Sequence, residues 1–226
     1  MIEMMADSSG VHPMRASTGV VTRASCVRLG WGRMMAATVL AGMMSISLVS
    51  CSSAPKNDTF DLAAAGVSSE TAGSARNRQI LIPDPTALKA LDSEQIVVRV
   101  SGSELQYLSK AQWSDRLPRM VQSKLIEAFE NSGKLGGVGK PGQGLAIDYQ
   151  LVTDIRAFEV EATGNRAVVE ISAKLLNDRN GSVRSQKVFR AVVPTRGSDN
   201  PAFITGLGAA FTAVTTDIVS WTLTQL

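Results

Sequence analysis

Residues 145–194 read LAIDYQLVTDIRAFEVEATGNRAVVEISAKLLNDRNGSVRSQKVFRAVVP, and this stretch decides the fold. Apolar and polar residues alternate along it, most clearly from Ala167 to Leu175. Such alternation is typical of β-strands that have one buried face and one solvated face. Thr163-Gly164-Asn165 separates the first two strands, and Asn180-Gly181, a strong hairpin signal, introduces a third strand over Ser182–Pro194. The stretch therefore predicts a three-stranded antiparallel meander.

Shorter extended runs precede the meander. They are rich in β-branched residues or alternate between apolar and polar positions, as strands do. The turn signal Ser101-Gly102-Ser103 predicts that the last two runs form a hairpin. The runs are Thr59–Ala65, Gln79–Ile82, Gln95–Val100 and Glu104–Leu108.

Two segments have helical periodicity instead. From Ser114 to Gly133, apolar residues recur at steps of three and four, which predicts an amphipathic helix. A second helix follows Asp199-Asn200-Pro201, and only Asp217 is charged within Ala202–Leu226, so we interpret it as a core helix rather than a membrane span. The prediction is a single α+β domain: a mainly antiparallel sheet with two amphipathic helices packed on one face.

The glycine-rich stretch Gly133–Gly144 contains a G-x-G-x-x-G pattern at Gly137–Gly142. A dinucleotide site needs a strand before these glycines and a helix after them. Here a helix precedes them, a strand follows and Pro141 interrupts them. We therefore predict an irregular loop rather than a nucleotide site.

The N-terminal region has the pattern of a lipoprotein signal peptide. Four arginines within residues 1–33 precede Met34–Val49, a run of 16 uncharged residues, which is short of the roughly 20 that a membrane span needs. Leu48-Val49-Ser50-Cys51 then resembles a lipobox. We predict a signal peptide over 1–50, with Met14 as an alternative start, and cleavage between Ser50 and Cys51. Cys51 would carry a diacylglycerol and an N-acyl chain at the head of a tether over 51–58, and the folded domain would occupy 59–226.

Removal of residues 1–50 would take four of the 23 basic and two of the 20 acidic side chains, which leaves a net charge of +1. No electrostatic footprint for nucleic acid remains. His12 and Cys26 would be lost as well, and Cys51 would be alkylated. A chain without histidine or free cysteine lacks the usual zinc ligands and the usual nucleophile pairs, so we predict no metal, no cofactor besides the lipid and no catalytic residue.

Carboxylates remain as the best catalytic alternative. Five acidic residues accompany the meander, and two of them could act as an acid–base pair. Asp148 and Glu170, the best candidates, lie on the polar phase of their strands, where cross-strand pairing with arginine or lysine explains them. The five are Asp148, Asp154, Glu159, Glu161 and Glu170.

A more specific pattern lies at Leu105–Gln122, LQYLSKAQWSDRLPRMVQ. It combines a tyrosine-containing strand, Ala-x-Trp ending at Trp113, and Leu117-Pro118 at the start of an amphipathic helix. In these features the chain resembles the ABC-type transport auxiliary lipoproteins, most sharply over Val97–Phe129 and more loosely over the rest of the domain.

The resemblance implies a non-enzymatic periplasmic lipoprotein that serves as an accessory docking subunit of an envelope lipid transport system. Its partners would be an ABC permease and ATPase complex and a protein with mammalian-cell-entry (MCE) domains, with phospholipid as a further candidate ligand. Tyr107, Trp113 and Asp115 are the candidate partner-binding residues, and Trp113 fits either an exposed or a core position.

Ser52 and Ser53 lack the aspartate that retains lipoproteins in the inner membrane of enteric bacteria. The outer membrane is therefore the expected location, and the inner membrane is the alternative. A lipoprotein activator of a peptidoglycan synthase remains the rival function, because it too needs only a tether and a binding face.

Overall fold

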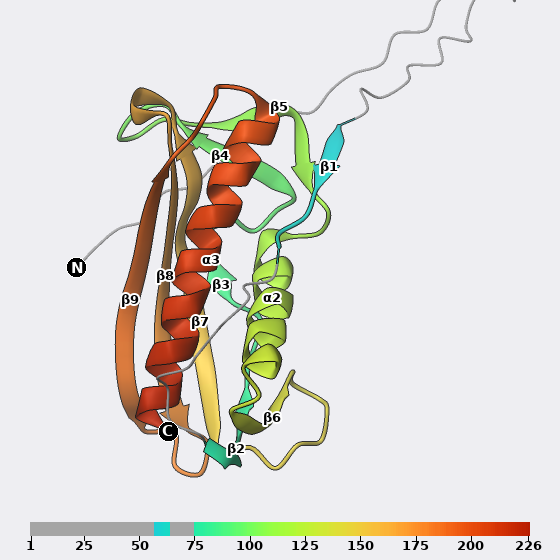
Figure 1. Ribbon diagram of the computed structural model, residues 1–226, viewed down its shortest axis with the longest axis vertical. Helices are drawn as coiled ribbons and strands as arrows, with labels where there is room; N and C mark the ends of the chain where they lie inside the picture. The colour runs from blue at the N-terminus through green and yellow to red at the C-terminus, as the bar shows by residue number, and fades with distance from the viewer. Residues whose placement is uncertain (1–56, 64–74) are drawn as a thin grey trace, which may run out of the picture. The chain divides into compact units, whose positions relative to one another are not determined.

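The computed structural model describes residues 57–63 and 75–226. The predicted signal peptide, Cys51 and most of the predicted tether lie outside these residues. The described strands are β1 (Asp58–Phe60), β2 (Ala75–Leu81), β3 (Thr86–Ala87), β4 (Gln95–Arg99), β5 (Leu105–Trp113), β6 (Leu135–Gly139), β7 (Tyr149–Glu161), β8 (Arg166–Asn177) and β9 (Val183–Pro194). The described helices are α2 (Leu117–Ser132), α3 (Asn200–Gln225) and the short 3₁₀ turn η3 (Ala162–Gly164). Figure 1 shows their arrangement.

The long strand β7 organises the sheet. One of its edges pairs antiparallel with β8 along its whole length, and β8 pairs antiparallel with β9. Its other edge pairs in succession with β2, β3 and β4, and all three run parallel to it. β5 forms an antiparallel hairpin with β4, β1 adds parallel to β5, and β6 adds parallel to β2. The predicted meander and the predicted hairpin are therefore confirmed.

The prediction of a mainly antiparallel sheet is wrong, because the nine described strands form a mixed sheet. The alternation of apolar residues identifies the buried face of a strand but not the direction of its neighbours. β2, β3 and β4 advance along β7 in its own direction, and the chain returns through β5 and α2 before β7 begins. That return is the crossover that parallel pairing requires.

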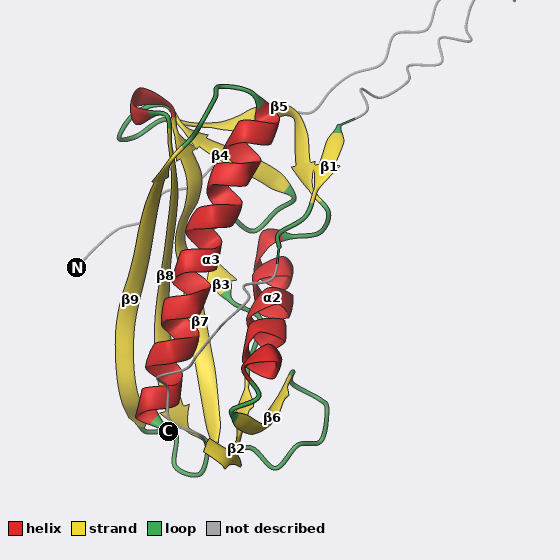
Figure 2. Ribbon diagram, viewed as in Figure 1, coloured by secondary structure: helices red, strands yellow, loops and turns green. Residues whose placement is uncertain are grey.

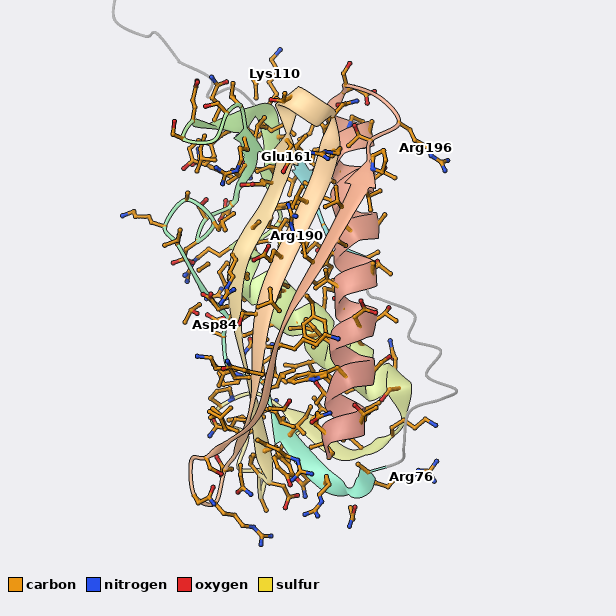
Figure 3. The ribbon with its side chains drawn as sticks, turned by 90° about the vertical axis from the view of Figure 1, so that its left-hand side faces the viewer. Arg76, Asp84, Lys110, Glu161, Arg190 and Arg196 are labelled. Atoms are coloured by element: carbon orange, nitrogen blue, oxygen red, sulfur yellow. The ribbon has the colours of Figure 1, made fainter. Side chains whose placement is uncertain are left out.

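Both helices pack against one face of the sheet, and we call the opposite face the helix-free face. Figure 2 shows α2 and α3 on the same side of the strands, and the turned view in Figure 3 places α3 to one side of β7, β8 and β9. Contacts join α3 to β7, β8, β9 and α2. In the described residues, α3 is the one helix long and apolar enough to cross a membrane. The fully buried Leu207, Phe211 and Ile218 nevertheless place one side of it in the core.

Hydrogen bonds and backbone conformation at single residues set where the two helices begin and end. The Asp199 carboxylate accepts a hydrogen bond from the backbone N–H of Ala202 (3.1 Å), which confirms the predicted start of α3. α2 begins at Leu117, with Arg116 rather than Ser114 as its N-cap. The backbone N–H of Ser114 donates to the carbonyl of Phe60, the last residue of β1. Gly133 closes α2 in the left-handed conformation (φ 59°).

The glycine-rich stretch is not wholly a loop, because residues 135–139 form β6. A Cβ on Gly136 would lie 2.3 Å from the Arg76 carbonyl oxygen of β2, so only glycine allows these strands to approach. Gly137 and Gly139 of the G-x-G-x-x-G pattern are paired with β2 residues. These two glycines therefore build a sheet and leave no phosphate cradle at the start of a helix.

Candidate docking surface

Trp113 lies in the core. It is the last residue of β5, its side chain is 1 % exposed, and its indole meets the Phe158 ring of β7 edge-on at 5.7 Å between centroids. Phe158 in turn contacts Phe211 of α3 at 5.8 Å. The indole therefore joins β5 to the sheet and, through Phe158, to α3, and it offers no surface to a partner.

Tyr107 and Asp115 are accessible but lie on different elements. Tyr107 of β5 is 45 % exposed. The Asp115 carboxylate, just before α2, accepts a hydrogen bond from the backbone N–H of Arg116 and forms an ion pair with Arg119 at 3.4 Å. Asp115 thus belongs to the start of a helix on the covered face. The three predicted residues do not form one site, and partner binding by Tyr107 and Asp115 stays a prediction.

The pairing register shows where Tyr107 lies. Residues directly opposite one another in neighbouring strands point to the same face. Two rows can be followed across β5, β4, β7, β8 and β9, and both lie on the helix-free face. The first row is Tyr107, Val97, Glu159, Val168 and Val192, and the second is Leu105, Arg99, Glu161, Arg166 and Pro194. We call these ten residues the five-strand surface.

A buried carboxylate lies at the centre of the five-strand surface. The Glu159 side chain is only 6 % exposed and accepts two hydrogen bonds from Arg99, one from Nε and one from Nη2 at 2.9 Å. The hydrogen bond to Glu159 raises the pKa of the Arg99 guanidinium above its usual range, against the opposing effect of burial. Such a two-point pair fixes both side chains in one geometry.

Further ion pairs connect the strands beside this carboxylate. Arg166 pairs with Glu161, and Arg190 of β9 lies 3.9 Å from Glu161 and 3.4 Å from Glu170. Arg156 continues the series, at 4.0 Å from Glu170. Figure 3 labels Glu161 and Arg190, which come from β7 and β9 with β8 between them. The predicted cross-strand pairing of Glu170 is therefore present.

Asp148 also forms ion pairs. It contacts Arg78 at 3.6 Å and Arg179 at 3.5 Å, and it accepts a hydrogen bond from the backbone N–H of Gln79. Asp148 and Glu170 thus hold separate sets of cations, and their described contacts do not pair them as acid and base. Across residues 57–63 and 75–226 there is no group of three or more His, Cys, Asp or Glu side chains placed to hold a metal ion.

Apolar side chains border the ion pairs. Tyr107 and Leu105 are 45 % and 39 % exposed at the β5 end of the rows, and Val192 is 40 % exposed at the β9 end. Val97 and Val168 between them are fully buried. A surface with exposed apolar ends and a fixed polar centre suits binding of another macromolecule. The sequence pointed to Tyr107 as a partner-binding residue and to Glu159 only as one of five candidate carboxylates. It did not point to Arg99 or Val192, because their proximity to these residues depends on pairing between distant strands.

The fold defines a class: an α+β domain with one face of its mixed sheet covered by two helices and the other free of helices among the described residues. Comparison with known families is specific. Residues 60–219 match the model of the ABC-type transport auxiliary lipoprotein component family. The match covers more than half of the chain, and the chain belongs to this family.

Two solved structures share the fold, and one further protein is similar in sequence. Protein XCC0632 from Xanthomonas campestris is 29 % identical, with a TM-score of 0.70 over 74 % of this chain and 95 % of that one. A second solved structure, of an uncharacterized protein, has a TM-score of 0.59 at 14 % identity over 73 % of this chain and 97 % of that one. An uncharacterized protein of Bradyrhizobium diazoefficiens is 27 % identical over 64 % of this chain, a match that spans only 39 % of that relative's length.

Proposed function

We propose that this chain is a lipid-anchored periplasmic subunit that docks on an ABC/MCE-type lipid transport system of the cell envelope, from the outer membrane. The match of residues 60–219 to the ABC-type transport auxiliary lipoprotein component family carries the proposal. An ABC permease and ATPase complex and an MCE-domain protein are the proposed partners. The role is one of binding and does not require chemistry by the described residues.

The proposed anchor is the lipid on Cys51. A single acyl chain holds a protein to a membrane only weakly, whereas two or more chains hold it stably. A diacylglycerol on the thiol and an N-acyl chain on the new N-terminus would supply three. The first described strand, β1, begins at Asp58, a few residues after Cys51, so the domain would work close to the membrane.

The five-strand surface is the proposed contact with the transport machinery. Tyr107 has the aromatic character that often dominates binding energy at interfaces. The Arg99–Glu159 pair beside it is already formed in the free protein, so the polar centre would need little ordering on association.

Crosslinking in the native envelope tests the proposal. The full-length protein, crosslinked and purified from intact cells, is expected to capture the MCE-domain protein or the permease. Cys51→Ala should abolish both membrane anchoring and capture. Tyr107→Ala should reduce capture while anchoring persists, and Leu88→Ala, which changes a residue that is 75 % exposed outside the five-strand surface, should capture normally.

Three outcomes would contradict the proposal. Capture of a peptidoglycan synthase in place of transport components would favour the rival function. If neither a transport component nor a peptidoglycan synthase is captured, the docking role is wrong. Recovery of the lipidated protein in the inner-membrane fraction would overturn the outer-membrane location. The docking role would still be decided by which proteins are crosslinked.

A further inference from the structure

The outer edge of β9 is unpaired within the described residues. β9 is a strand of 12 residues that pairs, among the described strands, with β8 alone. Figure 1 shows it at the margin of the sheet, with no described strand beyond it. A long strand with a free edge presents a row of backbone N–H and C=O groups that can accept another strand.

The register identifies the groups on that edge. The Thr195 N–H donates to the Asn165 carbonyl, immediately next to the Arg166↔Pro194 pair. In an antiparallel ladder, alternate residues bond to the neighbour while those between them point away from it. Counting back from Thr195, the backbone groups of Val188, Arg190 and Val192 point away from β8.

A groove lies beside this edge on the helix-covered side. It has a volume of about 340 Å³ and is bounded by Val193 and Pro194 of β9 and by Ala202, Gly206 and Ala209 of α3. Small residues along α3 leave this space beside the strand. A strand added to β9 would place every second side chain over the groove, and small apolar side chains suit it.

The positive charge along the β9 edge favours a negatively charged partner. The chain has five basic and no acidic residues between Asp178 and Asp199. The described ion pairs engage Arg179 and Arg190 with carboxylates but include neither Lys187 nor Arg196. Figure 3 shows Arg196 projecting from the loop between β9 and α3, and this residue also borders the groove.

Charge disfavours a second copy of the chain at this edge in one register. Antiparallel pairing of β9 with itself about Lys187 would place Lys187 opposite Lys187 and Arg184 opposite Arg190, and like charges on facing strands repel. An acidic strand would meet complementary charge along the same length.

We propose that the outer edge of β9 receives an extended acidic segment of a partner protein as an added strand. Lys187 and Val193 share the helix-covered side of β9, because they alternate with Val188, Arg190 and Val192. On that side of the added strand, small apolar side chains would lie over the groove, and acidic side chains at either end of them would lie near Lys187 and Arg196. The added strand would continue the five-strand surface, since Val192 and Pro194 end the two rows. The inference deepens the proposed function and rests on it for the identity of the partner.

A peptide experiment on the lipidated full-length protein in detergent tests the edge. The probe is a dye-labelled peptide about as long as β9, with Thr at every second position and, at the positions between, Glu near each end and Ala in the middle. Its counterpart replaces Glu by Lys. Binding is followed by fluorescence anisotropy, with hydrogen exchange of the β9 amides as a second readout. The acidic peptide should bind and slow exchange at Val188, Arg190 and Val192, and the lysine peptide should not bind.

Two pairs of variants make the test specific. Val188→Pro removes one outward N–H without touching the bonds to β8, whereas Val188→Thr keeps it. The proline variant should bind about tenfold more weakly than the threonine variant. Lys187→Glu should weaken binding by about tenfold, and Lys187→Arg should leave it unchanged. If Val188→Pro does not fold, the comparison of Lys187→Glu with Lys187→Arg tests the proposal. Equal binding by all folded variants, or equal binding of both peptides, would overturn the proposal.

Photocrosslinking in the native envelope separates this inference from the proposed function. p-Benzoylphenylalanine is placed at Val188 in one protein and at Tyr107 in another. Crosslinks from Val188 to an acidic segment of a transport component support both ideas. Transport components crosslinked from Tyr107 but never from Val188 overturn the edge proposal alone. An acidic segment from an unrelated envelope protein at Val188 supports the edge and overturns the docking role.

Discussion

The two faces of the sheet use the same strands in different ways. Phe158 of β7 points into the core against Trp113 and Phe211, while the next residue, Glu159, points to the helix-free face and binds Arg99. One face excludes water with aromatic and aliphatic side chains, and the other has ion pairs bordered by exposed apolar residues. We expect stability to come mainly from the first face and, in the proposed docking role, recognition to come from the second.

The largest expected effect is on the covered face. Trp113→Ala should lower the free energy of unfolding by about 3–5 kcal/mol, because it removes a fully buried indole and leaves a cavity between β5 and β7. Urea denaturation measures the loss, and Trp113→Phe, which keeps a ring against Phe158, should cost clearly less. A loss below about 1 kcal/mol would mean that the covered face does not dominate stability.

Glu159→Gln tests the deeply buried charge on the helix-free face. The substitution leaves Arg99 without its counter-charge, and we expect a loss of about 1–3 kcal/mol, since the guanidinium remains partly exposed to water. Arg99→Met and the double variant complete a double-mutant cycle. A coupling energy near zero would show that the pair positions side chains without stabilising the fold.

Arg190→Gln should cost at most about 1 kcal/mol, because the Arg190 side chain is 53 % exposed and its pairs with Glu161 and Glu170 are long, at 3.9 and 3.4 Å. The loss should shrink further at a salt concentration of about 1 M, which screens solvated charges but affects the Arg99–Glu159 pair less. Thermal unfolding at low and high salt measures both. An equal loss at the two salt concentrations would show that Arg190 acts through packing.

The smallest expected effect on stability is that of Tyr107→Ala, at about 0.5 kcal/mol or less, because the ring is 45 % exposed. If recognition resides on the helix-free face, this variant should nevertheless reduce crosslinking to the transport machinery more than Arg190→Gln does. Denaturation and crosslinking yield are measured on the same preparation. Unchanged crosslinking would remove Tyr107 from the docking surface.

Local pairings were predictable from the sequence. Asn180-Gly181 indicated the β8–β9 hairpin, and Ser101-Gly102-Ser103 the β4–β5 hairpin, because a short turn fixes which strands pair and in which direction. The pairings of β2, β3 and β4 with β7 were not predictable, since long stretches of chain separate the partners. The strand β6 was missed for another reason: its glycines remove the alternation of apolar and polar residues that marks a strand. The need for glycine becomes clear only in the structure, where Gly136 packs against the backbone of Arg76 in β2.

The candidate site was predictable only in part. The Leu105–Gln122 pattern drew attention to Tyr107 and Trp113, yet it could not show that one is exposed and the other is buried. Lys110, between them, adopts a left-handed backbone (φ 57°) that no periodicity indicates. The register of β5 against β4 shifts across this region, so the two aromatic residues face opposite sides of the sheet.

β1 has a mechanical consequence. It is the first described strand after the proposed anchor, it pairs with the end of β5 over only three residues, and Leu62 just beyond it is fully buried. Tension applied from the N-terminal side would therefore reach the sheet at β1. With only three paired residues, β1 should detach from β5 at a lower force than is needed to separate β7, β8 and β9. The rest of the sheet would then stay paired while β1 lengthens the connection to the membrane.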